Sequence, residues 1–204
     1  MLLVIHLMSS LQETPNRSEQ LFDKVSNIVI GNNYDCLVEA RKKAEQLGYT
    51  AEIINGFITG DVEDAALWLY QNTFRKIKEF PKKNLCFITG GETTVRITGA
   101  GKGGRNQHLA LCFLYLMSLS PIFTDRIYFM SAGTDGNDGP TDAAGAFACS
   151  EILEKSQKKD LDITWSLKEN DSYRFFEQFD QLFKTGPTNT NVCDIQVILY
   201  CGDQ

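Results

Sequence analysis

The residues best suited to chemistry lie in two glycine-rich segments near the middle of the chain. The first, Gly99-Ala-Gly-Lys-Gly-Gly104, precedes a predicted helix. Glycines let backbone amides approach an anion, a helix start adds partial positive charge, and Lys102 and Arg105 add full charges. A dinucleotide site is disfavoured because the next predicted strand ends in Ser131-Ala132, without the acidic residue that would bind a ribose. The segment therefore predicts a phosphate site, with a glycine-rich hairpin or helix entry as the alternative.

The second segment, Gly133–Asp142, carries three carboxylates, Asp135, Asp138 and Asp142. Carboxylates beside a phosphate loop suit Mg²⁺, which takes one or two of them together with substrate oxygens. Alternatively, one aspartate could accept the proton of an attacking hydroxyl group. For Asp142 we favour a structural role, as the cap of a following helix.

Glu92 follows Gly90-Gly91 at the end of another predicted strand. Its carboxylate would face a ligand there, or it is an exposed turn residue. Neither His6, in the leader, nor His108, on an apolar helix, supports a Ser–His hydrolase.

Alternating strands and helices must position these segments. Hydrophobic spacing and turn residues predict strands over 27–31, 50–54, 85–89, 93–98, 126–131 and 194–200, and helices over 32–48, 60–80, 105–119, 143–155 and 172–183. This order predicts an α/β fold, a layered domain whose helices flank a mostly parallel or mixed sheet. Ligands of such sheets bind at the carboxyl ends of the strands, so segments 31–33, 90–93, 99–107 and 133–142 should converge on one edge.

Composition limits the class of protein. The 204 residues are 43% hydrophobic and 23% charged, enough for one substantial core, and the net charge of −6 offers no basic field for nucleic acid or an anionic membrane. Six cysteines without a CxxC motif are typical of thiols in a reducing compartment, here the cytoplasm, with mitochondria as the alternative. Residues 1–21 are predicted to be a leader or linker, whose apolar run Met1–Met8 is too short for a membrane span, and residues 22–204 the folded domain.

Four ordered motifs resemble a known family. The motifs are Gly90-Gly-Glu-Thr-Thr94, Gly103-Gly-Arg-Asn-Gln107, Gly133–Gly145 and Thr185–Asn191. Together they resemble the C-terminal MOFRL region of glycerate 2-kinases, and residues 28–49 are similar to the stretch before it. The resemblance covers about residues 22–204.

The resemblance implies ATP- and Mg²⁺-dependent transfer of a phosphoryl group to the 2-hydroxyl of D-glycerate, in a cleft between two domains. Arg105 is similar to the motif arginine that would meet a phosphate or the glycerate carboxylate. Asp135 is similar to the motif aspartate available for Mg²⁺ or for activating the hydroxyl. The remaining residues implied to bind substrate or phosphate are Gly90, Gly91, Glu92, Thr93, Lys102, Gly104, Asn106, Gln107, Thr134 and Asp138.

The chain departs from the family pattern in places. Asn189 replaces a usual glycine, although asparagine tolerates a left-handed backbone, and His108 replaces a common glutamate. Family members usually carry an N-terminal Rossmann-like domain with a catalytic lysine, which residues 1–21 cannot supply. We therefore expect about half of an active site, inactive or nearly so alone, with the lost interface covered by that domain or by a homodimer partner. The alternatives are a hydroxypyruvate reductase and a non-catalytic domain that binds a ligand or partner.

Overall fold

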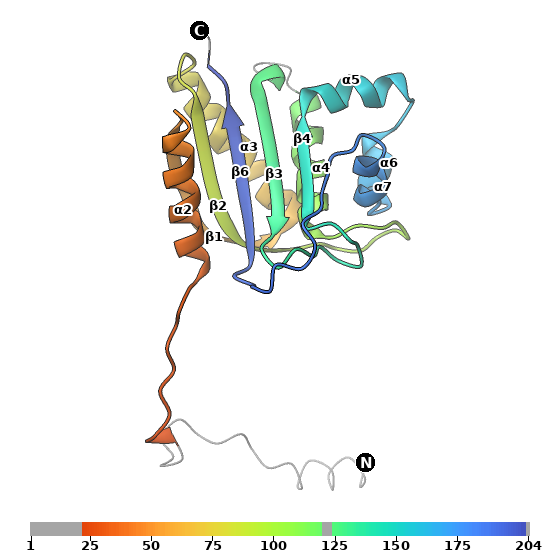
Figure 1. Cartoon of the computed structure of the whole chain (residues 1–204). Helices are drawn as coiled ribbons and strands as arrows, with labels where there is room; N and C mark the ends of the chain where they lie inside the picture. The colour runs from red at the N-terminus through yellow and green to blue at the C-terminus, as the bar shows by residue number, and fades with distance from the viewer. Residues whose placement is uncertain (1–21, 120–123, 203–204) are drawn as a thin grey trace, which may run out of the picture. The chain divides into compact units, whose positions relative to one another are not determined.

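The computed structural model describes residues 22–119 and 124–202, and Gly31–Gln204 form one compact unit. Its sheet has the strand order β1-β2-β6-β3-β4-β5 (Figure 1). The strands are β1 (Thr50–Asp61), β2 (Leu85–Thr94), β3 (Ile127–Gly133), β4 (Gly145–Cys149), β5 (Leu182–Phe183) and β6 (Asp194–Tyr200). Only β1 and β2 pair in parallel, because the last strand, β6, inserts between β2 and β3 and runs opposite to both. The α/β class and the mixed sheet are confirmed, whereas a mostly parallel sheet is wrong.

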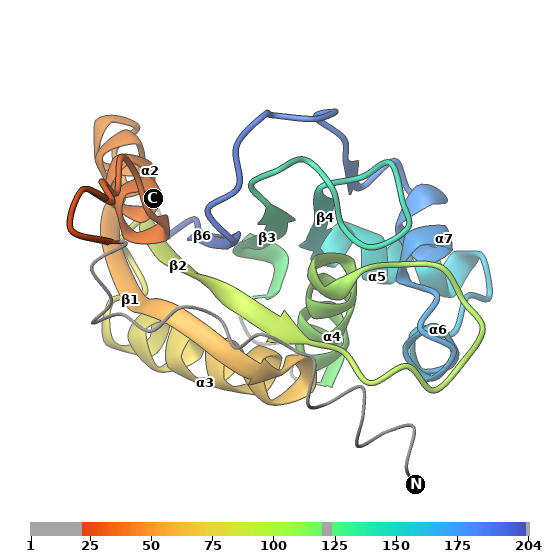
Figure 2. The same cartoon turned by 90° about the horizontal axis from the view of Figure 1, so that it is seen from below.

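Helices cover both faces of this sheet. They are α2 (Asn33–Gln46), α3 (Val62–Glu79), α4 (Arg105–Leu119), α5 (Ser150–Lys158), α6 (Ile163–Lys168) and α7 (Ser172–Glu177), with a 3₁₀ turn, η2, at Thr124–Arg126. Helix α2 lies on one face and α3 and α4 on the other, while α5, α6 and α7 gather beside α4 (Figure 2).

Helix α4 is the centre of the core. Its apolar residues are buried nearly all round, and the Phe113 ring stacks on Phe129 of β3 at a centroid distance of 4.3 Å. Ile198 and Tyr200 of β6 are fully buried in the same cluster. Each such side chain contributes roughly 1.5–3 kcal/mol on burial. This packing fixes the N-terminus of α4 at the edge where β2 and β3 end.

Local signals set the helix boundaries as predicted. Asn32 caps α2 in a capping box with Asp35, and Gly48 follows the helix with a φ of 90°. Asp61 caps α3 through the amide of Glu63. The predicted helices over 32–48, 60–80 and 105–119 are confirmed, as is the last strand.

Two strand predictions are wrong. Residues 27–31 adopt no strand, because an apolar run forms a strand only beside a partner. Residues 93–98 are no separate strand, since β2 continues through the two glycines to Thr94. Gly91 has a φ of 134°, and a Cβ there would overlap the Ile58 carbonyl oxygen, so this glycine serves close strand pairing rather than a turn.

Two helix predictions also need correction. Residues 143–155 begin with strand β4, whose Ala146 and Ala148 are buried against the core, and the helix starts only at Ser150. A Cβ on Gly145 would overlap the Ser131 carbonyl oxygen, so strand pairing overrides the helix propensity of alanine. The helix predicted over 172–183 ends at Glu177 and is followed by β5.

Asn189 adopts the left-handed backbone that its substitution for glycine requires, with a φ of 59°. Replacing it by alanine should lower the free energy of unfolding by about 1 kcal/mol, because a Cβ without a local hydrogen bond is disfavoured there. Asn189→Gly is the matched control and should stay within about 0.5 kcal/mol of the wild type in urea unfolding. Equal losses in both variants would show that the side chain, not the backbone, matters.

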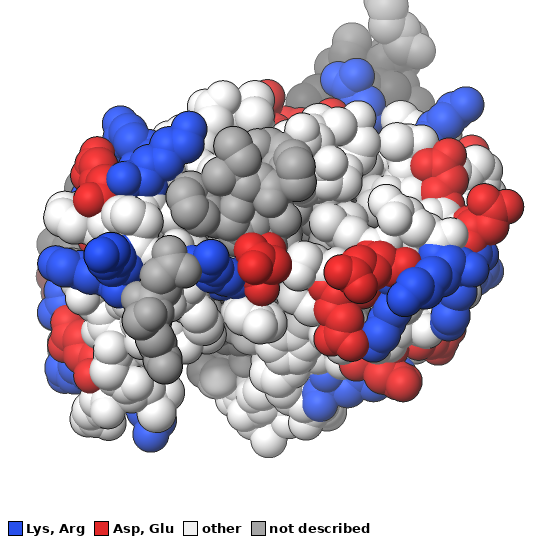
Figure 3. Space-filling view, turned by 90° about the horizontal axis from the view of Figure 1, so that it is seen from above, with Lys and Arg blue, Asp and Glu red and all other residues white. Residues whose placement is uncertain are grey.

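One end of the compact unit carries charges of both signs, rather than the uniformly basic surface that would bind a polyanion. At the end opposite the loops around Gly91 and Gly133, Lys and Arg side chains are interspersed with Asp and Glu (Figure 3). Among the described residues, no helix is long and apolar enough to cross a membrane. All six cysteines are free, and burial raises the pKa of Cys86 and Cys112 to about 12, as expected of structural thiols.

Candidate active site

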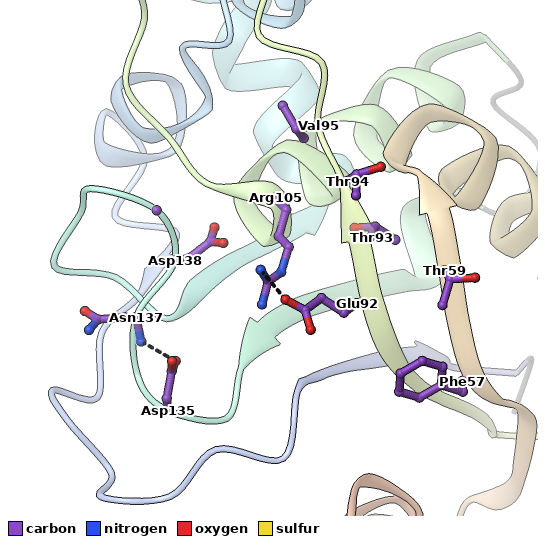
Figure 4. A pocket seen from close by; sticks show the side chains of 11 residues that line it. Phe57, Thr59, Glu92, Thr93, Thr94, Val95, Arg105, Asp135, Asn137 and Asp138 are labelled. Carbon is purple, nitrogen blue, oxygen red and sulfur yellow. Dashed lines mark hydrogen bonds and ion pairs between the residues drawn. The ribbon is translucent and has the colours of Figure 1, made fainter. Parts of the chain in front are cut away.

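A pocket of about 730 Å³ opens where β2 ends, at the lower edge of the sheet in Figure 1. It is lined by residues of β1, the end of β2, the first residue of α4 and the loop after β3 (Figure 4): Phe57, Thr59, Glu92, Thr93, Thr94, Val95, Arg105, Asp135, Asn137, Asp138 and Gly139. Three of the four predicted segments therefore converge. The fourth, 31–33, lines a neighbouring pocket that shares Phe57.

Arg105 is the cation of this pocket, and two carboxylates hold it. Its Nε and Nη2 donate to the two carboxylate oxygens of Asp194 at 2.6 and 3.0 Å. Its Nη1 lies 2.9 Å from Glu92 Oε1, the ion pair drawn in Figure 4. Hydrogen bonding to Asp194 raises the pKa of Arg105 further above its ordinary value, so the side chain is a fixed, permanent positive charge.

Asp194 is the functional residue that the sequence did not indicate. Its side chain is 1% exposed and lies at the first position of β6. In the sheet it faces Gly91 of β2 on one side and Gly133 of β3 on the other. The strand itself was predicted, but its place between those two glycines depends on pairing between segments far apart in the chain. Gly91 and Gly133, which lie near the ends of these two earlier strands, were the signal that the sequence offered.

Asp138 fills the position at the start of α4 where an anion was expected. Its carboxylate accepts the amide hydrogens of Asn106 and Gln107 at 3.0 and 2.8 Å, and a Cβ on Gly104 would strike it. Burial raises the pKa of Asp138 to about 6, although the two amides act in the opposite direction. The protein thus supplies its own anion to this helix N-terminus, which leaves less positive potential there for a phosphate.

The side chains of Asn106 and Gln107 hold the loop 133–142 rather than facing open solvent. Both are buried. Asn106 Oδ1 accepts from the Ser131 hydroxyl at 2.6 Å, and Gln107 Nε2 donates to the Thr141 hydroxyl at 2.9 Å. Neither lines the pocket, so a role in binding would be indirect, through the loop that carries Asp135.

Asp135 is half-buried and lines the pocket (Figure 4). One carboxylate oxygen accepts the Asn137 amide at 3.0 Å, and the other accepts Asn191 Nδ2 at 3.3 Å. Thr134 is tied down, because its hydroxyl donates to the Cys193 carbonyl and accepts the Val192 amide. These contacts orient Asp135 while both of its oxygens keep a lone pair for a ligand.

The loop 99–104 is anchored to the start of α7. A Cβ on Gly101 or Gly103 would overlap Asp171 or Ser172, so these glycines permit close backbone packing. The Lys102 ammonium lies 3.9 Å from the centre of the Tyr173 ring. Lys102 therefore contacts Tyr173 and is not among the residues that line the pocket.

Lys102→Ala is expected to lower the free energy of unfolding by about 0.5–1 kcal/mol, the value of a partly exposed cation–π contact. Its effect on the affinity of the pocket for an anion such as tripolyphosphate should be less than threefold, because other residues line the pocket. Thermal unfolding and isothermal titration calorimetry would measure both. A tenfold loss of affinity with unchanged stability would place the ammonium on a phosphate instead.

Two predicted residues have other partners. Asp142 caps no helix, because strand β4 follows it; instead it accepts hydrogen bonds from the Tyr173 hydroxyl at 2.7 Å and Lys184 Nζ at 2.9 Å. These bonds lower the pKa of Asp142. Gly90 makes room for Asn33, whose Nδ2 bonds to the carbonyls of Val192 and Asp194.

The donor set fits Mg²⁺ only in the kind of site where few of its ligands come from the protein. The described residues contain no cluster of three or more His, Cys, Asp or Glu that would enclose a metal. Mg²⁺ needs only one or two carboxylates when phosphate oxygens complete its shell. Asp135 fits that role, whereas Glu92 is paired with Arg105 and Asp138 with backbone amides.

Comparison with known protein families identifies the family to which the residues of this pocket belong. The model of the MOFRL family matches residues 85–194, which include Glu92, Arg105, Asp135 and Asp194 and make up more than half of the chain. The chain belongs to the MOFRL family. The resemblance predicted from the four motifs is thereby confirmed.

Relatives of this MOFRL chain carry the name glycerate kinase. It is 34% identical to glycerate kinase of Mus musculus, covering 86% of this chain and 41% of the relative, and 38% identical to D-glycerate 2-kinase of Thermotoga maritima, covering 91% and 43%. A crystal structure of glycerate kinase from T. maritima superposes with a TM-score of 0.77 at 37% identity, covering 84% of this chain and 41% of that one. A Pyrococcus horikoshii protein gives 0.76 at 31%, covering 97% and 44%. The chain thus spans about two fifths of the length of these relatives.

Proposed function

We propose that this chain supplies part of the active site of an ATP- and Mg²⁺-dependent D-glycerate 2-kinase, which transfers the γ-phosphoryl group of ATP to the 2-hydroxyl of D-glycerate. The observation that carries the proposal is the Arg105 guanidinium, held by Asp194 and Glu92, in one pocket with the carboxylate of Asp135. The names of the relatives support the substrate and reaction.

Arg105 would bind the transferred phosphoryl group or the glycerate carboxylate. Because Asp194 fixes two of its nitrogens, the guanidinium is oriented before substrate arrives, and little ordering is left to binding. Glu92 is half exposed and pairs with a single nitrogen, so an incoming anion can displace it.

Asp135 would either hold Mg²⁺ or accept the proton of the 2-hydroxyl as it attacks. Bound Mg²⁺ would neutralise charge on the phosphate oxygens. The two hydrogen bonds that Asp135 accepts from Asn137 and Asn191 hold its carboxylate in one orientation, which suits both roles. Thr93, buried beside Glu92 near the end of β2, and Asn137 add further polar groups to the lining of the pocket.

The remaining contacts would come from a second domain, because the relatives are more than twice as long. Alone, this chain should bind Mg²⁺–ATP or D-glycerate weakly and turn over slowly or not at all. A cytoplasmic location, a homodimer and the absence of nucleic-acid or membrane partners remain parts of the same proposal.

Titration calorimetry with Mg²⁺–ATP and D-glycerate, together with a coupled kinase assay, tests this. In the assay, the chain is compared with a chimera in which it replaces the matching part of the T. maritima kinase. The chimera should phosphorylate D-glycerate, and Arg105→Met and Asp135→Asn should each abolish that activity.

A chimera that folds but is inactive, or variants that keep its full rate, would contradict the proposal. Robust turnover by the chain alone would refute the proposal that a second domain must supply the rest of the active site. Oxidation of NADH or NADPH with hydroxypyruvate would favour the reductase instead.

A further inference from the structure

A second pocket, of about 280 Å³, lies on the other side of Arg105. It is bounded by the loop between β2 and α4, which swings out past α6 and returns to the start of α4 (Figure 2), and by Gly139 and Pro140 of the loop after β3. It shares Val95, Arg105 and Gly139 with the larger pocket. The two pockets are therefore adjoining parts of one site, with Arg105 between them.

Two buried polar atoms face this smaller pocket without a partner. His108, on α4, is 4% exposed, and its Nδ1 has no hydrogen bond to any described residue. Ser172, at the start of α7, is fully buried, and its hydroxyl likewise lacks a partner within the described ranges. A buried polar atom left unpaired costs about 1–3 kcal/mol, so two of them on different elements around one pocket indicate a ligand that satisfies them.

The remaining lining selects an uncharged ligand. Val95, Ile97 and Pro140 provide apolar surface. Arg105 is the only charged residue among those lining the pocket, and the proposed function already assigns its guanidinium to an anion in the larger pocket. A second anion here, such as D-glycerate, would find no further cation among the lining residues.

His108 is neutral in this setting. Burial lowers the pKa of His108, so one ring nitrogen is a donor and the other an acceptor. The Ser172 hydroxyl can also do either. Neutral groups that both donate and accept complement the edge of a heteroaromatic ring, whose nitrogens accept and whose amino groups donate.

We propose that the smaller pocket binds the nucleobase of the nucleotide, with His108 and Ser172 on its polar edge and Val95, Ile97 and Pro140 against its ring. The inference builds on the proposed kinase function, which puts the phosphates in the larger pocket beside Arg105. The volume accommodates a single purine. Continuity of the two pockets then allows one nucleotide to occupy both.

Titration of the full 204-residue chain with three probes tests the base site: ATP, inorganic tripolyphosphate and adenosine. Two variants remove base contacts. His108→Leu deletes a hydrogen-bonding group, and Ile97→Asp changes a side chain that is 80% exposed and therefore leaves folding intact. Leu119→Asp, at the far end of α4 and 63% exposed, is the matched control. Circular dichroism checks that each variant is folded.

ATP and adenosine affinity should fall at least tenfold in His108→Leu and at least fivefold in Ile97→Asp, with tripolyphosphate affinity unchanged within twofold and Leu119→Asp like the wild type. Adenosine binding that depends on His108, with no tripolyphosphate binding, would support the base site while the phosphate site of the proposed function fails. Equal affinity for ATP and tripolyphosphate with no adenosine binding would overturn the base site alone. Equal losses of ATP and tripolyphosphate binding in Ile97→Asp would overturn it too.

Discussion

Replacing Arg105 by methionine should lower the free energy of unfolding by about 3 kcal/mol at pH 7. The variant leaves the carboxylate of Asp194, 1% exposed, without either of its guanidinium donors, and an unpaired buried charge is among the costliest defects in a fold. The loss should stay below the roughly 5 kcal/mol of a fully buried pair, because a third of the Arg105 side chain is in contact with water. Urea unfolding at pH 7 measures it.

Two further variants separate the contribution of the positive charge of Arg105 from that of its two parallel hydrogen bonds to Asp194. Arg105→Lys keeps the cation but not the two parallel hydrogen bonds, and should lose about 1–2 kcal/mol. The double variant Arg105→Met with Asp194→Asn removes the stranded charge and should recover at least about 1 kcal/mol relative to Arg105→Met. If Arg105→Met lies within about 0.5 kcal/mol of the wild type, the pair does not stabilise the fold. In that case the orientation of Arg105 needs another explanation.

Comparing Asp194→Asn with Arg105→Met should separate the effect of this ion pair on stability from its effect on ATP binding. Asp194→Asn keeps a hydrogen-bond acceptor beside Arg105 and leaves the cation in place, so ATP affinity should fall less than in Arg105→Met. Arg105→Met removes the cation itself and should weaken ATP binding at least tenfold, the effect of one charged contact. Both variants are compared by titration calorimetry at a temperature well below their unfolding midpoints.

Features set by neighbouring residues could be predicted from the sequence. The cap at Asn32, the cap at Asp61 and the apolar face of α4 are local, and they placed three helices correctly. Arg105 and Asp135 were also placed correctly at one edge, because a helix start and a strand end lie at the ends of predictable elements.

Features set by long-range pairing could not be predicted. The position of β6 between β2 and β3 decides that Asp194, rather than a ligand, meets two nitrogens of Arg105. Strand β4 resembles a helix locally, and only contact with β3 reveals it. Asp138 lines the pocket as expected, but its carboxylate also accepts the amide hydrogens of Asn106 and Gln107 at the start of α4, which the local pattern did not predict. In each case a partner distant in sequence overrides the local pattern.

Asp138 should make stability depend on pH in a direction opposite to that of most aspartates. Its pKa is about 6 in the folded protein and near 3.8 when unfolded, so between those values the folded state holds a proton that the unfolded chain has lost. The contribution of this group is therefore fully present below about pH 4 and is lost as the pH rises through 6. The pKa difference corresponds to about 3 kcal/mol.

Urea unfolding of the wild type and Asp138→Asn between pH 4 and 7 isolates this effect, because the other carboxylates titrate alike in both proteins. The stability of the wild type minus that of the variant should fall by roughly 2 kcal/mol across the range, because the unfolded chain is still partly protonated at pH 4. Asp142→Asn is the control with a flat response: hydrogen bonds from Tyr173 and Lys184 lower the pKa of Asp142, so its contribution is already present at pH 4 and should stay nearly constant up to pH 7. If the difference between the wild type and Asp138→Asn grew with pH, the two amides of α4 would outweigh burial and keep Asp138 ionised. In that case the start of α4 would carry a fixed negative charge throughout the physiological range.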